Sequence, residues 1–335
     1  MSDSIAILVL NYNGRMHLDT CLTSVLEQVE KTDQVYLVDN GSIDGSIDHV
    51  RKHYPTVKVI DFQDNLGFAL AYNRAAAVVP EEYVIFLNND VEVGENWLSQ
   101  FKLALKHSSR NTIYGSEILL FDKRNIINHG GGSLTVIGAG FDSDYMQKHK
   151  AVEKVHFVGC VSGASMLIGR QAFLDLGGFD QDFFAYFEDV DLCWRAWLEG
   201  FRVLILPSSL VYHKLSSTMG PPLTPERIFL GEKNRLQAML KNLELQNIIA
   251  GLFASSVYCL IRVTYLLHMR KVRAVFAIMR GDLWVLRNIT RIIAKRKAVQ
   301  RTRKYSDRFL YKHGLMIGLI DGLRAFIRLT MLVYV

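Results

Sequence analysis

Residues 5–41 read IAILVLNYNGRMHLDTCLTSVLEQVEKTDQVYLVDNG, and this stretch indicates the fold class. Ile5–Leu10 is a continuous apolar run, which is typical of a strand buried on both faces of a sheet. Apolar residues then recur at helical spacing from Leu18 to Val29, and Val35–Val38 is a second apolar strand. Because strands that alternate with helices form parallel sheets, we expect an α/β fold with a mostly parallel central sheet.

The same alternation continues as far as residue 90. The elements expected there are a short helix with Ile47 and Val50, a strand over residues 57–62, a helix over residues 68–79 and a strand over residues 83–87. Ligands of parallel sheets bind at the carboxyl ends of the strands. Asn11, Asp39 and Asp90 each stand just past such an end, so we expect them on one rim.

The next part of the chain is less regular and then regains a strand pattern. Residues 108–160 are predicted as turns and a hairpin, and Val161–Ile168 as a strand. The segment FDQDFFAYFEDVDLCWRAWLEG at residues 179–200 is both aromatic and acidic, and a further strand is expected over Arg202–Leu206. Prolines at 221, 222 and 225 mark a boundary. We therefore predict one domain over residues 1–225, with halves at about 1–107 and 108–225, followed by a second region over 226–335.

Charge is divided between these two regions. The 335 residues carry a net charge of +6, but residues 226–335 hold 21 Lys and Arg against 6 Asp and Glu, a balance of +15. Residues 1–225 hold the other 18 and 27, a balance of −9. Helices that combine apolar and basic residues are typical of attachment to an anionic membrane. We expect residues 226–335 to lie in the membrane interface.

Three alternatives to interfacial attachment are open for this basic region. Residues 248–267 approach the ~20 apolar residues that a spanning helix needs, so a single span is the second choice. An ordinary helical domain with a solvated basic face is the third. Nucleic acid is disfavoured, because the aromatic residues belong to apolar stripes and do not interleave with the basic runs. The sequence leaves open whether the protein forms a homo-oligomer.

The compartment is predicted from the N-terminus and the cysteines. The first apolar run has no basic segment before it and is only about as long as a strand, so a secretory signal is not expected. The four cysteines, at 21, 160, 193 and 259, lack the close spacing of a zinc site, which favours a reduced compartment. Together with the basic region, these features predict the cytoplasmic face of the membrane. No GxxxxGK phosphate loop occurs.

Three groups of polar residues are candidates for chemistry. Asn88-Asn89-Asp90 offers oxygen ligands for Mg²⁺ or Mn²⁺ at a strand end, although Asn and Asp also form turns. Asp39 can accept a hydrogen bond from the imide of a pyrimidine base; the alternative is that Asp39 or Ser42 caps the helix that follows. Glu188, Asp189 and Asp191 place like charges among aromatic residues, which raises at least one carboxyl pKa, or they complement the start of a helix.

Six segments in order carry a resemblance to a known family. They are ILVLNYNGR, VYLVDNGSIDGS, DNLGFALAYNRA, YVIFLNNDVEV, FDQDFFAYFEDVDLCWRA and VYHKLSST. The sequence resembles the family-2 glycosyltransferases over residues 4–218, and most of all their non-processive, rhamnosyltransferase-type members. The basic helical tail is similar to that of membrane-associated members. The resemblance implies a GT-A fold and inverting transfer of a sugar from a nucleotide diphosphate.

The resemblance also implies roles for individual residues. Asp189, the second residue of the Glu188-Asp189 pair, matches the general base, and Asp90 matches the metal-binding aspartate, with His213 as a further metal ligand. Residues expected around the nucleotide sugar are Asn11, Tyr12, Asp39, Asn65, Gly67, Asn73, Asn88 and Asn89. Arg195 is our own added candidate, as a cation for the leaving diphosphate.

The resemblance favours dTDP-rhamnose as donor and a lipid-linked saccharide as acceptor. Donors that carry UDP or GDP suit the same site. A catalytically degenerate membrane scaffold is the alternative from another class, and its one supporting feature is that Asn88 replaces the first aspartate of the metal motif. The joint presence of Asp39, Asp90, Asp189 and His213 favours an active enzyme.

Overall fold

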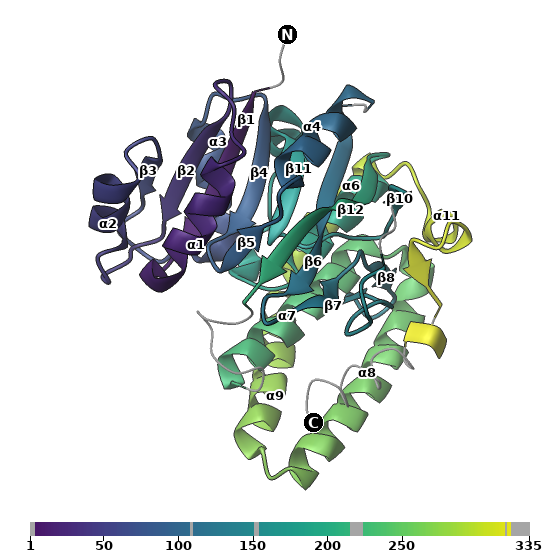
Figure 1. Cartoon of the computed structure of the whole chain (residues 1–335). Coiled ribbons are helices and arrows are strands. Elements are labelled where there is room, and N and C mark those ends of the chain that lie inside the picture. The colour runs from purple at the N-terminus through teal and green to yellow at the C-terminus, as the bar shows by residue number, and fades with distance from the viewer. Residues whose placement is uncertain (1–3, 108–109, 151–153, 215–223, 319, 323–335) are drawn as a thin grey trace.

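The computed structural model describes residues 4–107, 110–150, 154–214, 224–318 and 320–322. A central sheet carries helices on both faces, and a group of helices from the second half of the chain packs below it (Figure 1). The strands of the central sheet are β1 (Ile5–Asn11), β2 (Gln34–Asp39), β3 (Lys58–Asp61), β4 (Tyr83–Asn88), β5 (Val91–Val93), β6 (Thr112–Leu120), β7 (Lys123–His129), β10 (His156–Phe157), β11 (Ser165–Gly169) and β12 (Arg202–His213).

The sheet has the order β10-β12-β6-β11-β4-β1-β2-β3, with β5 paired to β12 and β7 paired to β6. β1 is parallel to β2 and β4, β2 is parallel to β3, and β12 is parallel to β6. β11 lies antiparallel between β4 and β6. The prediction of a mostly parallel α/β sheet is confirmed.

Alternating side chains of the strands form two cores, one on each face. Ile5, Ile7 and Val9 pack against helices α1 (Arg15–Leu26), α2 (Ser46–His53) and α4 (Trp97–Lys106). Ala6 and Leu8 face the other way, towards α3 (Gly67–Val78), α5 (Arg170–Asp175) and α6 (Glu188–Leu198). Both faces are covered by helices, which explains why the strands are apolar without interruption.

The irregular segment holds more structure than the sequence indicates. β6 is a nine-residue strand in the middle of the sheet, where we predicted only turns and a hairpin. Its sequence, TIYGSEILL, contains Gly115, Ser116 and Glu117, which interrupt the apolar run but are all buried. Val161 lies against Gly115, where an added Cβ would be 2.4 Å from the valine Cβ. A small three-stranded sheet joins β8 (Ser133–Thr135), β9 (Gly140–Phe141) and β13 (Met316–Ile317).

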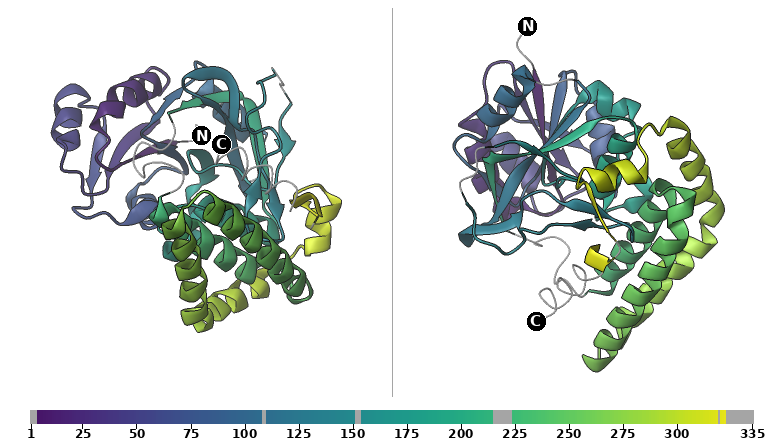
Figure 2. Two further views of the ribbon diagram at one scale, coloured as in Figure 1. Left: turned by 90° about the horizontal axis from the view of Figure 1, so that it is seen from below. Right: turned by 90° about the vertical axis from the view of Figure 1, so that its right-hand side faces the viewer.

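The basic region is helical, as predicted. Its helices are α7 (Pro225–Asn242), α8 (Leu245–His268), α9 (Val272–Arg287), α10 (Ile289–Thr302) and α11 (Asp307–Lys312). α7 begins at the predicted boundary, but it shares the core beneath the sheet, since its Leu236 and Met239 pack in the same cluster as Trp194 of α6. α8 and α9 form a hairpin that extends away from the sheet (Figures 1 and 2).

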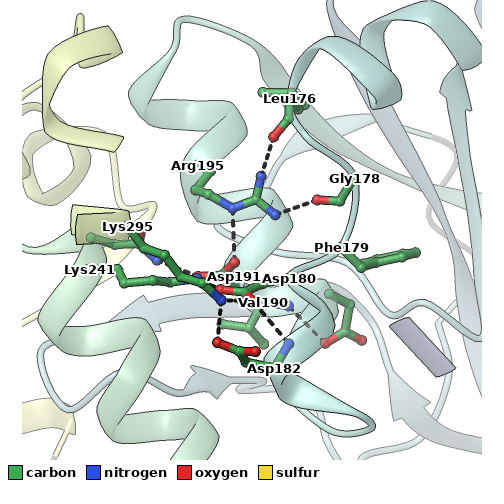
Figure 3. A network of polar contacts seen from close by, with 12 residues as sticks. Leu176, Gly178, Phe179, Asp180, Asp182, Val190, Asp191, Arg195, Lys241 and Lys295 are labelled. Atoms are coloured by element: carbon green, nitrogen blue, oxygen red, sulfur yellow. Dashed lines mark hydrogen bonds and ion pairs between the residues drawn. The ribbon is translucent and has the colours of Figure 1, made fainter. Parts of the chain in front are cut away.

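Part of the positive charge of this region is neutralised inside the protein (Figure 3). Lys241 lies 2.5 Å from Asp180 and 3.0 Å from Asp191, and Lys295 also pairs with Asp180. The other pairs in this interior are Lys295–Asp182, Arg262–Glu232 and Arg235–Glu232. Lys241 and Lys295 therefore join the tail to the catalytic half, whereas the pairs of Glu232 lie within the tail.

Candidate active site

The carboxyl ends of β1, β2 and β4 meet at one rim, as the sequence predicts. Asn11 and Asp39 are register partners in β1 and β2, and the Asn11 amide donates to the Asp39 carboxylate at 2.8 Å. The Asn89 amide donates to the side-chain oxygen Oδ1 of Asn11 at 2.6 Å. These three side chains are buried, so their hydrogen bonds stabilise the loops at this rim from inside the protein.

Asp39 holds the turn that follows β2. Its carboxylate accepts the backbone N–H of Ser42 at 2.8 Å as well as the Asn11 amide, and the residue is fully buried. Asn40, the next residue, donates from its amide to the Asn65 side chain at 3.0 Å and to the carbonyl oxygen of Gly67 at 3.2 Å. Asn40, which directly follows Asp39, therefore connects the Asp39 turn to Asn65 and Gly67. The contacts of these three predicted residues with a nucleotide stay predictions.

Asp90 and His213 come together from distant strands. Asp90 follows β4, and His213 is the last residue of β12. The His213 Nε2 lies 3.1 Å from the Asp90 Oδ1 and 3.5 Å from the Asn88 amide nitrogen. The lone histidine of the sequence analysis is thus beside the predicted metal-binding aspartate.

The donor set of this pair fits a divalent cation that also binds phosphate. Asp90 offers a hard oxygen ligand and His213 an imidazole nitrogen, and Mg²⁺ or Mn²⁺ usually keeps several positions for water and phosphate oxygens. Within the part of the chain that the structure describes, no cluster of three or more Asp, Glu, His or Cys side chains could hold a metal without such added ligands. A metal at this pair would need water or phosphate oxygens to complete its coordination.

The acidic triplet at the start of α6 is divided between two environments. The Asp189 carboxylate accepts the backbone N–H of Gly163 at 2.9 Å and that of Val190 at 2.8 Å, and its side chain is partly exposed. Asp191 is fully buried and faces Arg195 and Lys241. Asp189 is therefore the member of the triplet that can reach a ligand, and Asp191 is structural.

Glu188 is the carboxyl group whose pKa is raised. Burial raises the pKa of Glu188 well above its usual value, and the neighbouring Asp189 charge adds to the rise. Its Oε2 is buried with no hydrogen-bond partner among the described residues. Within the triplet, Glu188 is therefore the carboxyl group whose pKa is raised, by burial first and by the like charge of Asp189 second.

The loop before α6 has an unusual backbone. Phe184, Tyr186 and Phe187 have φ angles of 63°, 71° and 66°, in the left-handed region that few non-glycine residues adopt. Asn234 of α7 lies close enough for its amide to donate to the carbonyl oxygens of residues 183, 185 and 186, at 2.7 to 2.9 Å. Surrounding structure must fix such a backbone, and here α7 supplies part of it.

Most of the predicted residues surround one cleft of about 470 Å³. The predicted residues that line it are Tyr12, Asn65, Gly67, Asn88, Asn89, Asp90, Glu188, Asp189 and His213. Phe184 closes over Gly67, where an added Cβ would be 2.5 Å from the Phe184 ring. A second hollow of about 880 Å³, between α1 and β12, holds none of the predicted residues, so the smaller cleft is the candidate active site.

Arg195 does not line this cleft, so the structure gives no support to its predicted contact with the leaving diphosphate. Its guanidinium is buried and donates to Asp191 at 2.9 Å and to the carbonyl oxygens of Leu176 and Gly178 at 2.6 and 2.7 Å (Figure 3). Asn73 is likewise occupied, since its amide exchanges two hydrogen bonds with the backbone of Phe179. Both residues fix the segment that leads into α6.

Sequence reasoning missed the cleft residues contributed by other segments. Residues 162–164 line the cleft, and Gly163 donates to Asp189. Arg227, in the first turn of α7, also lines it. No sequence signal separates Arg227 from the other basic residues of the tail. The i, i+4 spacing of Asp191 and Arg195 could have shown that Arg195 is paired within its own helix.

Comparisons with known proteins agree with this geometry. The chain is 29% identical over 247 residues to an N-acetylglucosaminyl-diphospho-decaprenol L-rhamnosyltransferase of Mycobacterium tuberculosis, which covers 66% of this chain and 80% of the relative. Among solved structures, GalNAc-T7 with UDP, GalNAc and Mn²⁺ aligns with a TM-score of 0.59 and 19% identity, over 71% of this chain and 48% of that one. The chain therefore spans about half of that structure.

A second structure covers almost all of the chain. It is the mannosyltransferase PcManGT from Pyrobaculum calidifontis in complex with GDP-Man and Mn²⁺, with a TM-score of 0.51 and 14% identity, over 98% of this chain and 86% of that one. These likenesses show a GT-A fold. Residues 6–177, about half of the chain, match the sequence pattern of glycosyl transferase family 2. The chain is a glycosyltransferase that belongs to this family.

Proposed function

We propose that this glycosyltransferase moves L-rhamnose from dTDP-rhamnose to a hydroxyl group of a lipid-linked saccharide, with inversion at the anomeric carbon. The observation that carries the proposal is the convergence of the Asp90–His213 pair and Asp189 on one cleft. The mycobacterial relative, whose name describes rhamnosyl transfer to a diphospho-decaprenol saccharide, supports this donor sugar and acceptor class.

The proposed reaction is a single displacement. Asp189 takes the proton from the acceptor hydroxyl as that oxygen attacks the anomeric carbon. The bond from this carbon to the diphosphate oxygen breaks, and the nucleoside diphosphate leaves with the electron pair. The backbone N–H groups of Gly163 and Val190 hold the Asp189 carboxylate in place. Mg²⁺ or Mn²⁺, held by Asp90 and His213, would neutralise the charge of the leaving diphosphate.

A panel of sugar nucleotides tests the donor. We expect dTDP-rhamnose with Mg²⁺ or Mn²⁺ to raise the melting temperature, because a ligand that binds only the folded state stabilises it by about 2.7 kcal/mol at a hundredfold excess over its Kd. Addition of EDTA should remove most of this shift. If only a UDP- or GDP-sugar raised the melting temperature, that sugar nucleotide would be the donor instead of dTDP-rhamnose. Folded protein that responds to no sugar nucleotide would favour a membrane scaffold instead.

We further propose that α8 and α9 dock on the cytoplasmic, anionic face of the membrane. Large apolar side chains lie on the outer sides of these helices, with exposed fractions from 60% to 77%. They are Leu245, Ile249, Phe253, Leu260, Phe276 and Leu286. In α8 they recur at spacings of four, four and seven residues. In α9 the exposed residues Met279 and Leu283 lie between Phe276 and Leu286, at spacings of three, four and three residues, so each helix carries one stripe. Arg270, Lys271, Arg273, Arg280 and Arg287 are also exposed in this hairpin.

This docking surface suits interfacial attachment better than a span. By length and hydropathy, α8 alone among the described helices is long and apolar enough to cross a bilayer. Its inner face, however, carries Arg262, which is buried and lies 2.6 Å from Glu232 of α7. A helix surrounded by lipid would lose this pairing. Attachment by the outer stripe keeps it and places the cleft near a lipid-linked acceptor.

Vesicle binding tests the docking surface. The double variant Phe276→Ser/Leu286→Ser should bind vesicles that contain phosphatidylserine at least about tenfold more weakly, because each buried large apolar side chain contributes about 1.5–3 kcal/mol. Arg273→Gln/Arg280→Gln should weaken binding to these vesicles and leave binding to phosphatidylcholine vesicles nearly unchanged. Met16→Ser, an exposed apolar residue on α1, serves as the control. Wild-type binding by both double variants would contradict the proposed surface.

A further inference from the structure

The cleft has an unbalanced set of charges for a ligand that carries phosphate. Its lining includes the carboxyl groups of Asp90, Glu188 and Asp189. Among the described residues that line it, Arg227 is the one Lys or Arg side chain. A diphosphate placed among three carboxyl groups needs positive charge close to its oxygens. Arg227 is placed to provide part of it.

The other basic side chains of α7 are engaged inside the protein. Lys233 donates to the carbonyl oxygen of Asp182 at 2.5 Å and to the Asn234 side chain at 2.8 Å. Arg235 donates to the carbonyl oxygen of Ile137 at 2.7 Å and pairs with Glu232. Lys241 pairs with Asp180 and Asp191. Of the four basic residues before the end of α7, Arg227 is the one whose side chain lines the cleft.

The position of Arg227 is fixed from two sides. It is the third residue of α7, and its guanidinium carbon lies 5.2 Å from the centre of the Tyr186 ring. Tyr186 belongs to the loop with left-handed φ angles that precedes α6. Asn234, which lies on α7 like Arg227, donates a hydrogen bond to the carbonyl oxygen of Tyr186. A side-chain hydrogen bond also joins the guanidinium to Tyr186. A guanidinium has five N–H donors, so its remaining ones can bind two phosphate oxygens at once.

We propose that Arg227 binds a diphosphate group in the cleft. The proposal rests on the proposed function, and it gives Arg227 the role that the sequence assigned to Arg195. Two reactants of that function carry this group: the nucleoside diphosphate of the donor and the diphosphate that joins the acceptor saccharide to its lipid. The positive end of the α7 dipole has the same sign as the arginine and adds to the attraction.

Calorimetric titration of the full chain with Mg²⁺ tests this role. The probes are dTDP and thymidine for the donor side, and farnesyl diphosphate and farnesol for the acceptor side. Arg227→Gln should weaken binding of at least one diphosphate by about ten- to a hundredfold, the usual effect of losing a charge-assisted hydrogen bond. Binding of thymidine and farnesol, which lack the group, should not change. Arg227→Lys, which keeps the charge, should recover part of the loss.

The pattern of losses distinguishes the two sources. A loss for dTDP alone assigns Arg227 to the donor, and a loss for farnesyl diphosphate alone assigns it to the acceptor. Arg124→Gln is the matched control, since Arg124 also stacks on a tyrosine, Tyr212, but lies outside this cleft. Unchanged binding of both diphosphates, or an equal loss for thymidine, would overturn the proposal. If the wild type binds none of dTDP, UDP and GDP, the result contradicts the proposed function itself and not only the role of Arg227.

Discussion

Replacement of Asp189 by Asn removes nearly all sugar transfer and leaves donor binding intact. Asn has the same shape and can still accept the N–H of Gly163, but it cannot take a proton from the acceptor hydroxyl. Loss of a general base typically costs about 10²- to 10⁴-fold in rate. The measurement is the turnover number with saturating donor and acceptor, with the donor Kd determined in parallel by calorimetry.

Glu188→Gln is the comparison that makes this result specific. Because burial raises the pKa of Glu188 well above its usual value, the uncharged side chain of glutamine suits the same buried position. We expect a much smaller loss of turnover than for Asp189→Asn. A larger loss for Glu188→Gln would transfer the role of base to Glu188, and near-normal turnover of Asp189→Asn would exclude Asp189.

Replacement of Lys241 by Met lowers the free energy of unfolding by about 3–5 kcal/mol, the usual effect of leaving a buried charge without its partner. Lys241 is buried between Asp180 and Asp191, so its loss removes a cation from both carboxylates (Figure 3). Lys297→Met, at an exposed position of α10, is the control and should change stability little. Urea denaturation followed by circular dichroism measures both variants, and equal stability of the two would contradict the prediction.

The same ion pairs give the stability a defined pH dependence. Burial alone would raise the pKa of Asp180, but the ammonium groups of Lys241 and Lys295 outweigh it and hold this pKa far below its usual value. A carboxyl group whose folded pKa is depressed stabilises the protein above its unfolded pKa of about 3.9. This contribution is lost as the pH falls below that value. Lys241→Met should therefore show a shallower loss of stability in acid than the wild type.

The α/β half of the fold was predictable because its elements alternate over short distances. β1, β2 and β4 each contain a run of apolar residues that ends at a polar residue, Asn11, Asp39 and Asn88 respectively. β6 was not predicted because its residue composition does not favour a strand. The segment forms a strand because neighbouring segments pack against it. Gly115 and Ser116 have low strand propensity, but Val161 and Ser165 pack on them in the folded sheet.

The site was predicted where its residues follow strands, and not where they come from the tail. Asp90, Asp189 and His213 belong to segments with a recognisable order along the chain, and all three line the cleft. Arg195 was assigned by charge alone, although a partner four residues away already satisfies it. Arg227 and Asn234 reach the cleft and its loop through packing between distant segments, which no local pattern reveals.

The clamp that Asn234 forms on the loop before α6 determines how this protein can be divided. An exchange of tails between relatives at residue 225, where the charge changes sign, would remove Asn234 and leave the carbonyl oxygens of Phe183, Ala185 and Tyr186 without this donor. Chimaeric enzymes and shortened expression clones should instead be joined beyond Asn242, the last residue of α7. The tail is therefore not an interchangeable module, because its first helix is inherited together with the active site.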